Sequence, residues 1–402
     1  MNASKVSFPN AAGQQLSARL ELPVDRHPHA FAIFAHCFTC SSDLTAIRNI
    51  SRELNLQGIG VLRFDFTGLG ESDGDFVDTT FTTNISDLVA AAEWLAREYA
   101  APKLLIGHSL GGAAVLCAAT RLPSVRAVAT IGAPFAPDHV SRHFAEQLDQ
   151  IATEGQATVN IGGRPFRIAK QFVDDLGNHE IQTNIKELDA ALLILHSPQD
   201  RTVGIDEAAK LYAAARHPKS FVSLDGADHL LSESADSHYA GQVIAGWSGR
   251  YLPPPAADPL ESDHKVAVRL GREGYTTEVM VRQHHLTADE PVKVGGNDFG
   301  PGPYELVSAG LGACTAMTIQ LYARRKGWVV EEVQVHLNHK KDYMQDMENS
   351  DERPTKIDHF ERVVVLKGDL DEKQKQRLLE IADRCPVHRT LHETVEVTTV
   401  LG

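Results

Sequence analysis

Residues 104–112, LLIGHSLGG, place a serine between two glycines, at the point where a short apolar run meets a segment of small residues. The run LLI predicts a buried strand, and GGAAVLCAAT after the serine predicts a helix. Gly107 and Gly111 permit a tight turn, which would lift the Ser109 hydroxyl above the C-terminal edge of a sheet and face it toward the helix N-terminus. A bare G-x-S-x-G is often a chance match or a packing turn, but this strand–turn–helix setting favours a nucleophilic serine.

Apolar runs and helical stretches alternate on both sides of this motif from residue 30 onward. The expected strands include HAFAIFAHCF, IGVLRFDF and VRAVATIGAPF, and the expected helices include AIRNISRELNLQG and NISDLVAAAEWLAREY. This alternation predicts an α/β doubly wound fold, a parallel sheet covered by helices on both faces. The alternation lapses after Pro137 and resumes with ALLILH and FVSLDG, so we expect residues 137–187 to form a small lid.

The length of 402 residues favours two domains, because one hydrophobic core rarely grows that large. The segment YLPPPAADPLES, at about 252–262, has a proline-rich composition that stiffens the chain and buries little surface. We therefore expect one domain over 1–251, a linker, and a second domain over 263–402. The second domain mixes a hairpin, an apolar helix, further strands and an amphipathic helix, which predicts an α+β fold rather than another doubly wound sheet.

The formal net charge is −14 and no basic run appears, which argues against nucleic acid as a partner, since duplex binding requires clustered Lys and Arg. The N-terminal segment MNASKVSFPNAAG lacks the basic and apolar regions of a signal peptide. No uninterrupted apolar stretch approaches the ~20 residues of a membrane span. These features predict a soluble cytoplasmic protein with no membrane partner.

The five cysteines are too few and too scattered for a disulfide framework, so each is expected to be a packing residue or a reactive thiol. Cys117, within the apolar run AAVLCAAT, is expected in the core. Cys37 and Cys40 form a C-x-x-C, for which a redox or metal role is the less favoured alternative. No second pair lies at metal spacing, so we expect no metal site.

A serine nucleophile requires a base oriented by a carboxylate, in the chain order Ser, acid, His for this architecture. Asp200 follows the expected strand ALLILH, and His229 follows the last strand in SLDGADHLL. Both would lie at strand C-terminal ends, where the sites of open α/β sheets gather. The rival acids are Asp138, Asp225 and Asp228.

Five motifs together resemble the α/β-hydrolase family over residues 1 to about 250, namely IFAHCFTCSSD, DFTGLGESDG, GHSLGG, PQDRTV and GADHLL. By position, the resemblance implies that the backbone amides of Leu110 and Phe38 form the oxyanion hole. The chain departs from the usual His-Gly pair of the family because Cys37 follows His36. The resemblance implies acyl transfer on an ester, with thioesterase, amidase and perhydrolase activity as alternatives that share the same triad.

Cys314 and Cys385 are the candidate reactive thiols of the C-terminal half. We expect Cys314 about one turn into the helix announced by GPGPYELVSAGLGAC, where small neighbours leave space and the helix N-terminus favours a thiolate. Cys385 ends the amphipathic stretch LLEIADRC, and Pro386 is expected to stop that helix. Two unrelated core cysteines are the alternative.

Residues from about 262 to 402 resemble the OsmC/Ohr family of peroxide-reducing proteins through GGNDFGPGPYELVSAGLGACTAMT, YARRKGW and IADRCPVHRTL. The resemblance implies that Cys314 attacks a hydroperoxide and that Cys385 resolves the sulfenic acid as a disulfide. A dithiol, often lipoyl-linked, would reduce that disulfide, and no tightly bound cofactor is implied. Arg272 and Glu305 would assist the thiolate, although the usual carboxylate position is occupied by Tyr304.

The order of the two halves resembles bifunctional α/β-hydrolase/OsmC fusion proteins, and it implies a homodimer held by the C-terminal half. Small ester and hydroperoxide molecules are then the expected substrates. A coupled reaction, in which the first half releases a hydroperoxide that the second half reduces, is a further hypothesis. The shifted glutamate motivates an opposing hypothesis, a C-terminal half that serves only for dimerisation or ligand binding.

Overall fold

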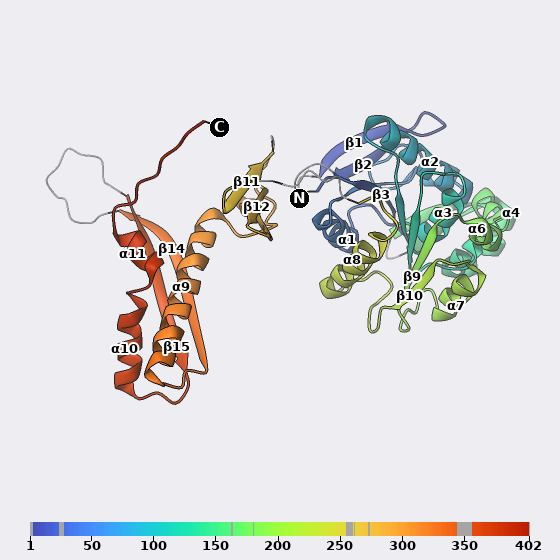
Figure 1. Cartoon of the computed structure of the whole chain (residues 1–402). Coiled ribbons are helices and arrows are strands. Elements are labelled where there is room, and N and C mark those ends of the chain that lie inside the picture. Colours follow the sequence, from blue (N-terminus) through green and yellow to red (C-terminus); the bar gives the residue numbers. More distant parts are fainter. Residues whose placement is uncertain are drawn as a thin grey trace. The chain divides into compact units, whose positions relative to one another are not determined.

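The computed structural model describes residues 3–401 except 24–27, 162–163, 180, 255–259, 261, 272–273 and 344–355. It consists of two compact units, each described below by itself (Figure 1). The first comprises residues 1–263 with 269–271, and the second comprises 264–268 with 272–402.

An eight-stranded sheet forms the centre of the first unit, in the order β1-β2-β4-β3-β5-β6-β9-β10. The first two strands are antiparallel to their neighbours, and β4, β3, β5, β6, β9 and β10 run parallel. The middle strands β3, β4, β5, β6 and β9 are buried along their full length, as continuous apolar runs require when helices cover both faces. The bounds are Ser4–Pro9 (β1), Gln15–Glu21 (β2), Ala30–Ala35 (β3), Ile59–Phe64 (β4), Leu104–His108 (β5), Ala127–Ile131 (β6), Ala191–His196 (β9) and Lys219–Ser223 (β10).

Helices cover both faces of this sheet, so the doubly wound fold predicted from the sequence is confirmed (Figure 1). Helices α1 and α8 pack together on one face, and α2, α3 and α7 contribute to the core on the other. Helix α2 begins at a capping box in which the Thr80 and Thr83 side chains each bond the other's backbone. The bounds are Thr45–Leu56 (α1), Phe81–Glu98 (α2), Leu110–Ala119 (α3), Ile205–Ala214 (α7) and Ser234–Ser248 (α8), with a 3-10 turn η1 at Phe76–Asp78.

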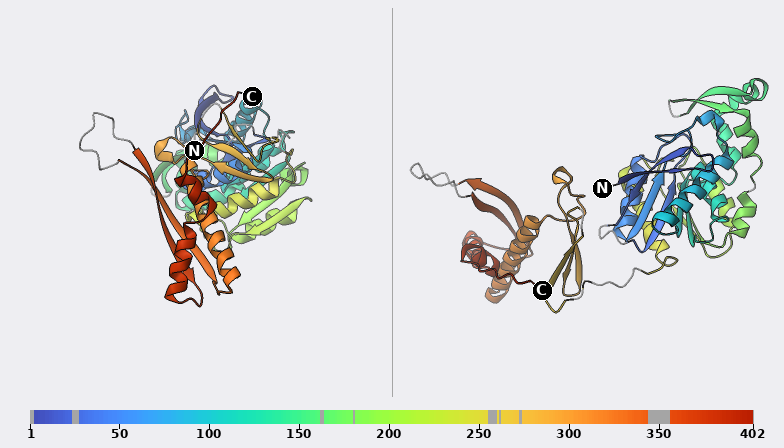
Figure 2. Two further views of the ribbon diagram at one scale, coloured as in Figure 1. Left: turned by 60° about the vertical axis from the view of Figure 1, so that its left-hand side comes forward. Right: turned by 90° about the horizontal axis from the view of Figure 1, so that it is seen from above.

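The segment between β6 and β9 forms its own small substructure where the sequence predicts a lid. The right-hand view of Figure 2 shows it, in green, at one end of the first unit. Its apolar residues, including Phe144, Ile168 and Phe172, join the core that contains α2 and α3. The elements are η2 (Pro137–Gln147), α4 (Leu148–Glu154), β7 (Gln156–Ile161), β8 (Arg164–Ala169), α5 (Lys170–Leu176) and α6 (Ile181–Glu187).

The second unit is α+β, as predicted. The two strands of the expected first hairpin, β11 and β12, form a small sheet with a third strand, and a two-stranded ladder packs against α9 and α10 (Figure 1). Helix α9 is long and apolar enough to cross a membrane by length and composition, and 28% of its most apolar window is buried. One such helix is weak evidence for a span. The bounds are Val266–Leu270 (β11), Thr277–Val281 (β12), His284–Ala288 (β13), Val292–Val294 (η3), Pro303–Lys326 (α9), Glu332–Tyr343 (β14), Lys356–Lys367 (β15), Glu372–Ala382 (α10) and Pro386–His392 (α11).

Candidate active site

Ser109 lies at the sharp turn between β5 and α3, in a backbone conformation that a side chain rarely adopts, with φ 54° and ψ −124°. The flanking glycines are required sterically. A Cβ at Gly107 would lie 2.3 Å from the Gly111 carbonyl oxygen, and a Cβ at Gly111 would lie 2.4 Å from the His36 carbonyl oxygen. The turn therefore presents the serine at the end of β5 and brings the start of α3 against the end of β3.

A hydrogen-bonded relay connects Ser109 to a histidine and a carboxylate. His229 Nε2 lies 3.0 Å from Ser109 Oγ, and His229 Nδ1 lies 2.7 Å from Asp200 Oδ2. The other oxygen of Asp200 accepts the backbone N–H groups of Thr202 and Val203, at 2.8 and 2.9 Å. Burial raises the pKa of Asp200, but these bonds and His229 outweigh it, and the pKa lies below its ordinary value. Asp200 is thus an ionised and fixed partner for the Nδ1–H of His229.

A second histidine, His108, contacts the backbone of His229. His108 Nε2 donates to the carbonyl oxygen of His229 at 2.7 Å. Burial lowers the pKa of His108 to about 3, with the nearby His229 as a further cause, so this ring stays neutral around pH 7. Gly132, with φ 55°, passes so close that a Cβ would lie 3.3 Å from both Asp200 Oδ2 and His229 Nδ1.

Of the three carboxylates that were alternatives to Asp200, two bond groups other than His229. Asp225 Oδ1 accepts the Ser223 hydroxyl, and Asp228 Oδ1 accepts the Ser232 backbone N–H at 2.8 Å. Asp138 lies in the first turn of η2. The carboxylate that meets His229 in the structure is Asp200, as the chain order of the motifs predicts.

The loop after β3 runs beside the start of α3, so the structure brings the Phe38 segment and Leu110 to one place. Residues 37–40 and Leu110 line the same cavity as Ser109 and His229. The expectation of reactive or packing thiols in this loop is wrong, because Cys37 and Cys40 form a disulfide. The two cysteines are three residues apart with their Cα atoms 5.4 Å from each other, so this disulfide can form locally without a network of further disulfides.

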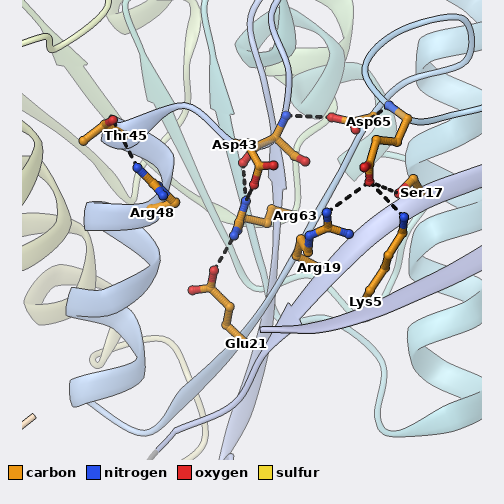
Figure 3. A network of polar contacts seen from close by, with 11 residues as sticks. Lys5, Ser17, Arg19, Glu21, Asp43, Thr45, Arg48, Arg63 and Asp65 are labelled. Atoms are coloured by element: carbon orange, nitrogen blue, oxygen red, sulfur yellow. Dashed lines mark hydrogen bonds and ion pairs between the residues drawn. The ribbon is translucent and has the colours of Figure 1, made fainter. Parts of the chain in front are cut away.

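The loop is anchored on its far side by charged residues at the end of β4 (Figure 3). The Arg63 guanidinium donates to the Ser42 carbonyl oxygen and to Asp43, both at 2.6 Å, and to Glu21 at 2.7 Å. Asp65 Oδ1 accepts the Ser42 backbone N–H at 2.7 Å. Arg63 and Asp65 were not singled out by sequence reasoning, although both lie beside or within the quoted motif DFTGLGESDG.

A cavity of about 240 Å³ opens at Ser109. The segment between β6 and β9 contributes His139, Val140, His143 and Ile161 to its wall, which also includes Val203 and Leu230. Burial lowers the pKa of His143, with repulsion from His229 as a lesser cause. The cavity is therefore lined by apolar side chains with a few polar groups, as small-molecule pockets commonly are.

The two C-terminal thiols lie on different parts of the second unit: Cys314 is within α9, and Cys385 lies between α10 and α11. Cys314 is partly exposed on α9, Cys385 is fully buried, and both are free. Cys385 Sγ lies 3.7 Å from Thr315 Oγ1 and accepts the His388 backbone N–H at 3.2 Å. Pro386 begins helix α11, with Cys385 as its N-cap.

One expectation for Cys314 is wrong. Helix α9 begins at Pro303, so Cys314 lies about three turns into it rather than one. The favourable effect of a helix N-terminus on an anion fades within the first turn, and it therefore does not reach this thiol. Any stabilisation of a thiolate there must come from other groups.

The two residues expected to assist the thiolate have different outcomes. Glu305 accepts the Gly302 backbone N–H at 2.7 Å in the first turn of α9. Arg272 lies outside the described residues. The arginine that the structure places at the thiol contact is Arg362 on β15, whose guanidinium donates to Thr315 Oγ1 at 2.9 Å and to Asp383 at 2.6 Å. In the strand FERVVVL, Arg362 lies on the same face as Val364 and Leu366, and this alternation could have indicated from the sequence that its side chain points inward.

Comparison with known protein families gives two matches along the chain. The model described as alpha/beta hydrolase family matches residues 32–241, more than half of the sequence. The chain belongs to the alpha/beta hydrolase family. Its C-terminal part is an OsmC-like domain, matched over residues 295–400 by the model described as OsmC-like protein.

Several known alpha/beta hydrolases resemble the first unit. The solved esterase domain of a Rhodothermus marinus protein is 50% identical with a TM-score of 0.53, and the match covers 63% of this chain and 100% of that one. The mouse palmitoyl-protein thioesterase ABHD10 is 26% identical over 208 residues, which are 49% of this chain and 68% of that protein. Human ABHD12B is 30% identical, over 40% of this chain and 42% of its own length. These relatives support a hydrolase of the esterase or thioesterase type.

Proposed function

We propose that the first unit hydrolyses carboxylic esters through a covalent acyl-enzyme on Ser109. The observation that carries the proposal is the relay of 3.0 Å from Ser109 Oγ to His229 Nε2 and 2.7 Å from His229 Nδ1 to Asp200. Both distances lie within the range in which a histidine acts as a general base for a serine hydroxyl. The 50% identity to an esterase domain supports an ester rather than an unrelated substrate.

The reaction follows from the positions of these groups. His229 takes the Ser109 proton as the oxygen attacks the ester carbonyl carbon, and then gives that proton to the departing alkoxide. The backbone amides of Phe38 and Leu110 would stabilise the oxyanion of the tetrahedral intermediate. A water molecule, deprotonated by His229, then attacks the acyl-enzyme and releases the acid.

Thioesters are the second substrate class for this site. The same proton transfers and oxyanion donors serve both acyl groups, and the relative from mouse is named a palmitoyl-protein thioesterase. The cavity of about 240 Å³ at the serine would have to hold the start of an acyl chain, and its lid residues would select its length. A panel of p-nitrophenyl esters and acyl-thioesters of increasing chain length would separate the two classes by kcat/KM.

The direct test is turnover of a p-nitrophenyl ester by the full chain and by Ser109→Ala. The proposal predicts a loss of at least about 10³-fold in kcat, since removal of a triad nucleophile leaves only binding and the oxyanion hole. Ser86→Ala, a serine on the surface of α2, serves as the matched control and should keep its activity. Unchanged turnover by Ser109→Ala would refute the proposal.

For the OsmC-like domain we propose thiol peroxidase activity, in which Cys314 attacks a hydroperoxide oxygen to give a sulfenic acid and an alcohol. Cys385 would then form the Cys314–Cys385 disulfide with release of water, and a dithiol would reduce it. Two free thiols, one partly exposed and one buried beside the same helix, support this assignment. The alternative is a domain that binds or dimerises without thiol turnover.

Stoichiometric cumene hydroperoxide followed by mass spectrometry discriminates between these alternatives. A new Cys314–Cys385 disulfide supports the peroxidase, and unmodified cysteines support the binding module. The shifted carboxylate position, and the bond of Glu305 to the Gly302 N–H, are reasons to test this half before any coupled reaction is assumed.

We also propose that the OsmC-like domain forms a homodimer. Met317 and Leu321 on α9 are 71% and 53% exposed, and Val363 and Val365 project from the uncovered face of β15. The described part of the C-terminal tail adds Val395, Val397 and Val400, also exposed. Apolar surface of this extent on one small unit is typical of an interface, and a second copy would bury it.

A further inference from the structure

The Cys37–Cys40 disulfide has no role in the proton relay, yet it lies in the segment that carries one proposed oxyanion donor. It closes a ring around Phe38 and Thr39. Both cysteines line the cavity at Ser109, and Cys37 is 3% exposed whereas Cys40 is half-buried. A reagent small enough to enter the substrate cavity could therefore reach a redox-active bond.

The turn inside this ring has an unfavourable local conformation. Thr39 has φ 62°, in the left-handed region that β-branched residues rarely adopt. Across the turn, the Cys40 N–H bonds the Cys37 carbonyl oxygen at 3.3 Å, and Thr39 Oγ1 donates to the adjacent Phe38 carbonyl oxygen. The covalent bond between the cysteines thus holds a conformation that local preferences oppose.

The flanks of the turn are fixed independently of the disulfide. On one side, the His36 ring accepts the Phe66 backbone N–H at 3.3 Å, and on the other the Ser42 N–H binds Asp65 at 2.7 Å. The backbone that could change when the disulfide opens is therefore confined to residues 37–41, between these two anchors. That short piece contains the Phe38 amide.

We propose that Cys37 and Cys40 form a redox site whose oxidation state controls the serine site, with a small dithiol as its reductant. The inference rests on the proposed hydrolase function. A thiolate of the dithiol attacks the Cys40 sulfur, the S–S bond breaks, and a mixed disulfide forms. The second thiol of the reductant then releases Cys40, leaving two cysteine thiols and a cyclic disulfide, so two electrons and two protons pass to the protein.

A hydroperoxide would reverse this change. One cysteine thiolate attacks the O–O bond to give a sulfenic acid and an alcohol, and the other thiol displaces water to restore the disulfide. In the reduced form Thr39 is free to leave the left-handed region, and the Phe38 amide turns away from the oxyanion position. Because this donor acts most strongly in the transition state, its loss lowers kcat and leaves KM nearly unchanged.

The test uses the full chain treated with dithiothreitol, desalted without oxygen and assayed with a p-nitrophenyl ester. Alkylation and peptide mapping establish that the Cys37–Cys40 pair is reduced. We expect kcat to fall by about 10- to 10³-fold with a KM change under about threefold, the range for loss of one oxyanion donor. Two equivalents of cumene hydroperoxide, one for this pair and one for the Cys314–Cys385 pair, should restore both the Cys37–Cys40 disulfide and kcat.

The matched control is the double variant C37S/C40S. It should show the low kcat of the reduced enzyme and no response to dithiothreitol, which separates this pair from the other three cysteines. Unchanged kcat in wild-type enzyme whose pair is mapped as reduced would overturn the inference while leaving the hydrolase function intact. Activity in the oxidised enzyme that survives Ser109→Ala would instead overturn the hydrolase function itself.

Discussion

Asp200 is buried and pairs with His229 through one oxygen while two backbone amides hold the other. In Asp200→Asn the shape is kept, but the amide can present its NH2 group to Nδ1 and favour the wrong imidazole tautomer. We expect kcat for ester turnover to fall by about 10³–10⁴-fold with little change in KM. Asp228→Asn, next to the histidine but bonded to Ser232, is the control and should stay within a few-fold of wild type.

His108 makes the stability of the first unit depend on pH. Burial lowers its pKa to about 3 in the folded protein, whereas an unfolded histidine titrates near its ordinary value of 6.5. The unfolded state therefore binds the extra proton first, and the free energy of unfolding should fall as pH decreases from about 6.5 toward 3. Urea unfolding at several pH values in this range should show that the free energy of unfolding falls less steeply with decreasing pH in His108→Gln than in the wild type. The same pH dependence in both proteins would contradict this role of His108.

The serine, histidine and acid could be predicted because each follows a strand in a fixed chain order, and strand ends meet at one edge of a parallel sheet. The disulfide could not, because Cys-Phe-Thr-Cys is compatible with free thiols until the turn brings Cys37 and Cys40 together. The depth of Cys314 in α9 was misjudged for a related reason. The helix starts at Pro303, within the segment that the sequence announced, and not near the glycines around residue 310.

A buried ion pair between β4 and β2 holds the arginine that bonds the loop after β3. The Arg63 and Glu21 side chains are 5% and 2% exposed and lie 2.7 Å apart (Figure 3). Burial raises the pKa of Glu21 although Arg63 opposes this effect, so the carboxyl depends on its partner. We expect Arg63→Met to lower the free energy of unfolding by about 3–5 kcal/mol, because it leaves a buried carboxyl without its cation.

The double variant Glu21→Leu/Arg63→Met tests this reason, since it removes both charges. Measured by chemical denaturation, its free energy of unfolding should lie between those of Arg63→Met and the wild type. A double variant less stable than Arg63→Met would refute this explanation. Lys5→Ala, which breaks an exposed ion pair with Glu71, is the control and should leave the free energy of unfolding almost unchanged.

Among the elements, the sheet and its covering helices followed from the sequence because each central strand is one uninterrupted apolar run. The lapse in that alternation marked the segment between β6 and β9, but its β7–β8 hairpin could not be predicted, since short polar strands have a weak periodic signal. In the second unit, the mixture of expected strands and helices predicted the α+β class correctly. It did not show that Val363 and Val365 on β15 stay exposed, because alternation along a strand does not say which face packs against the helices.

The whole molecule carries exposed apolar residues on its OsmC-like domain, and the proposed dimer explains them. Met317→Glu/Leu321→Glu places charges on this exposed part of α9 and should convert a dimer to a monomer in light scattering coupled to gel filtration. Tyr239→Glu, an equally exposed position on α8 of the first unit, should leave the mass unchanged. Equal masses for wild type and the double variant would contradict a dimer through α9.

We propose Ser109 as the acyl-transfer nucleophile of the whole chain, and the site of fluorophosphonate labelling tests this assignment directly. Full-length protein is incubated with the probe, digested and mapped by mass spectrometry while ester turnover is followed in the same sample. The account predicts one adduct on the peptide that contains Ser109, formed in parallel with loss of activity. An adduct on a different residue, or full inactivation with Ser109 unmodified, would contradict it.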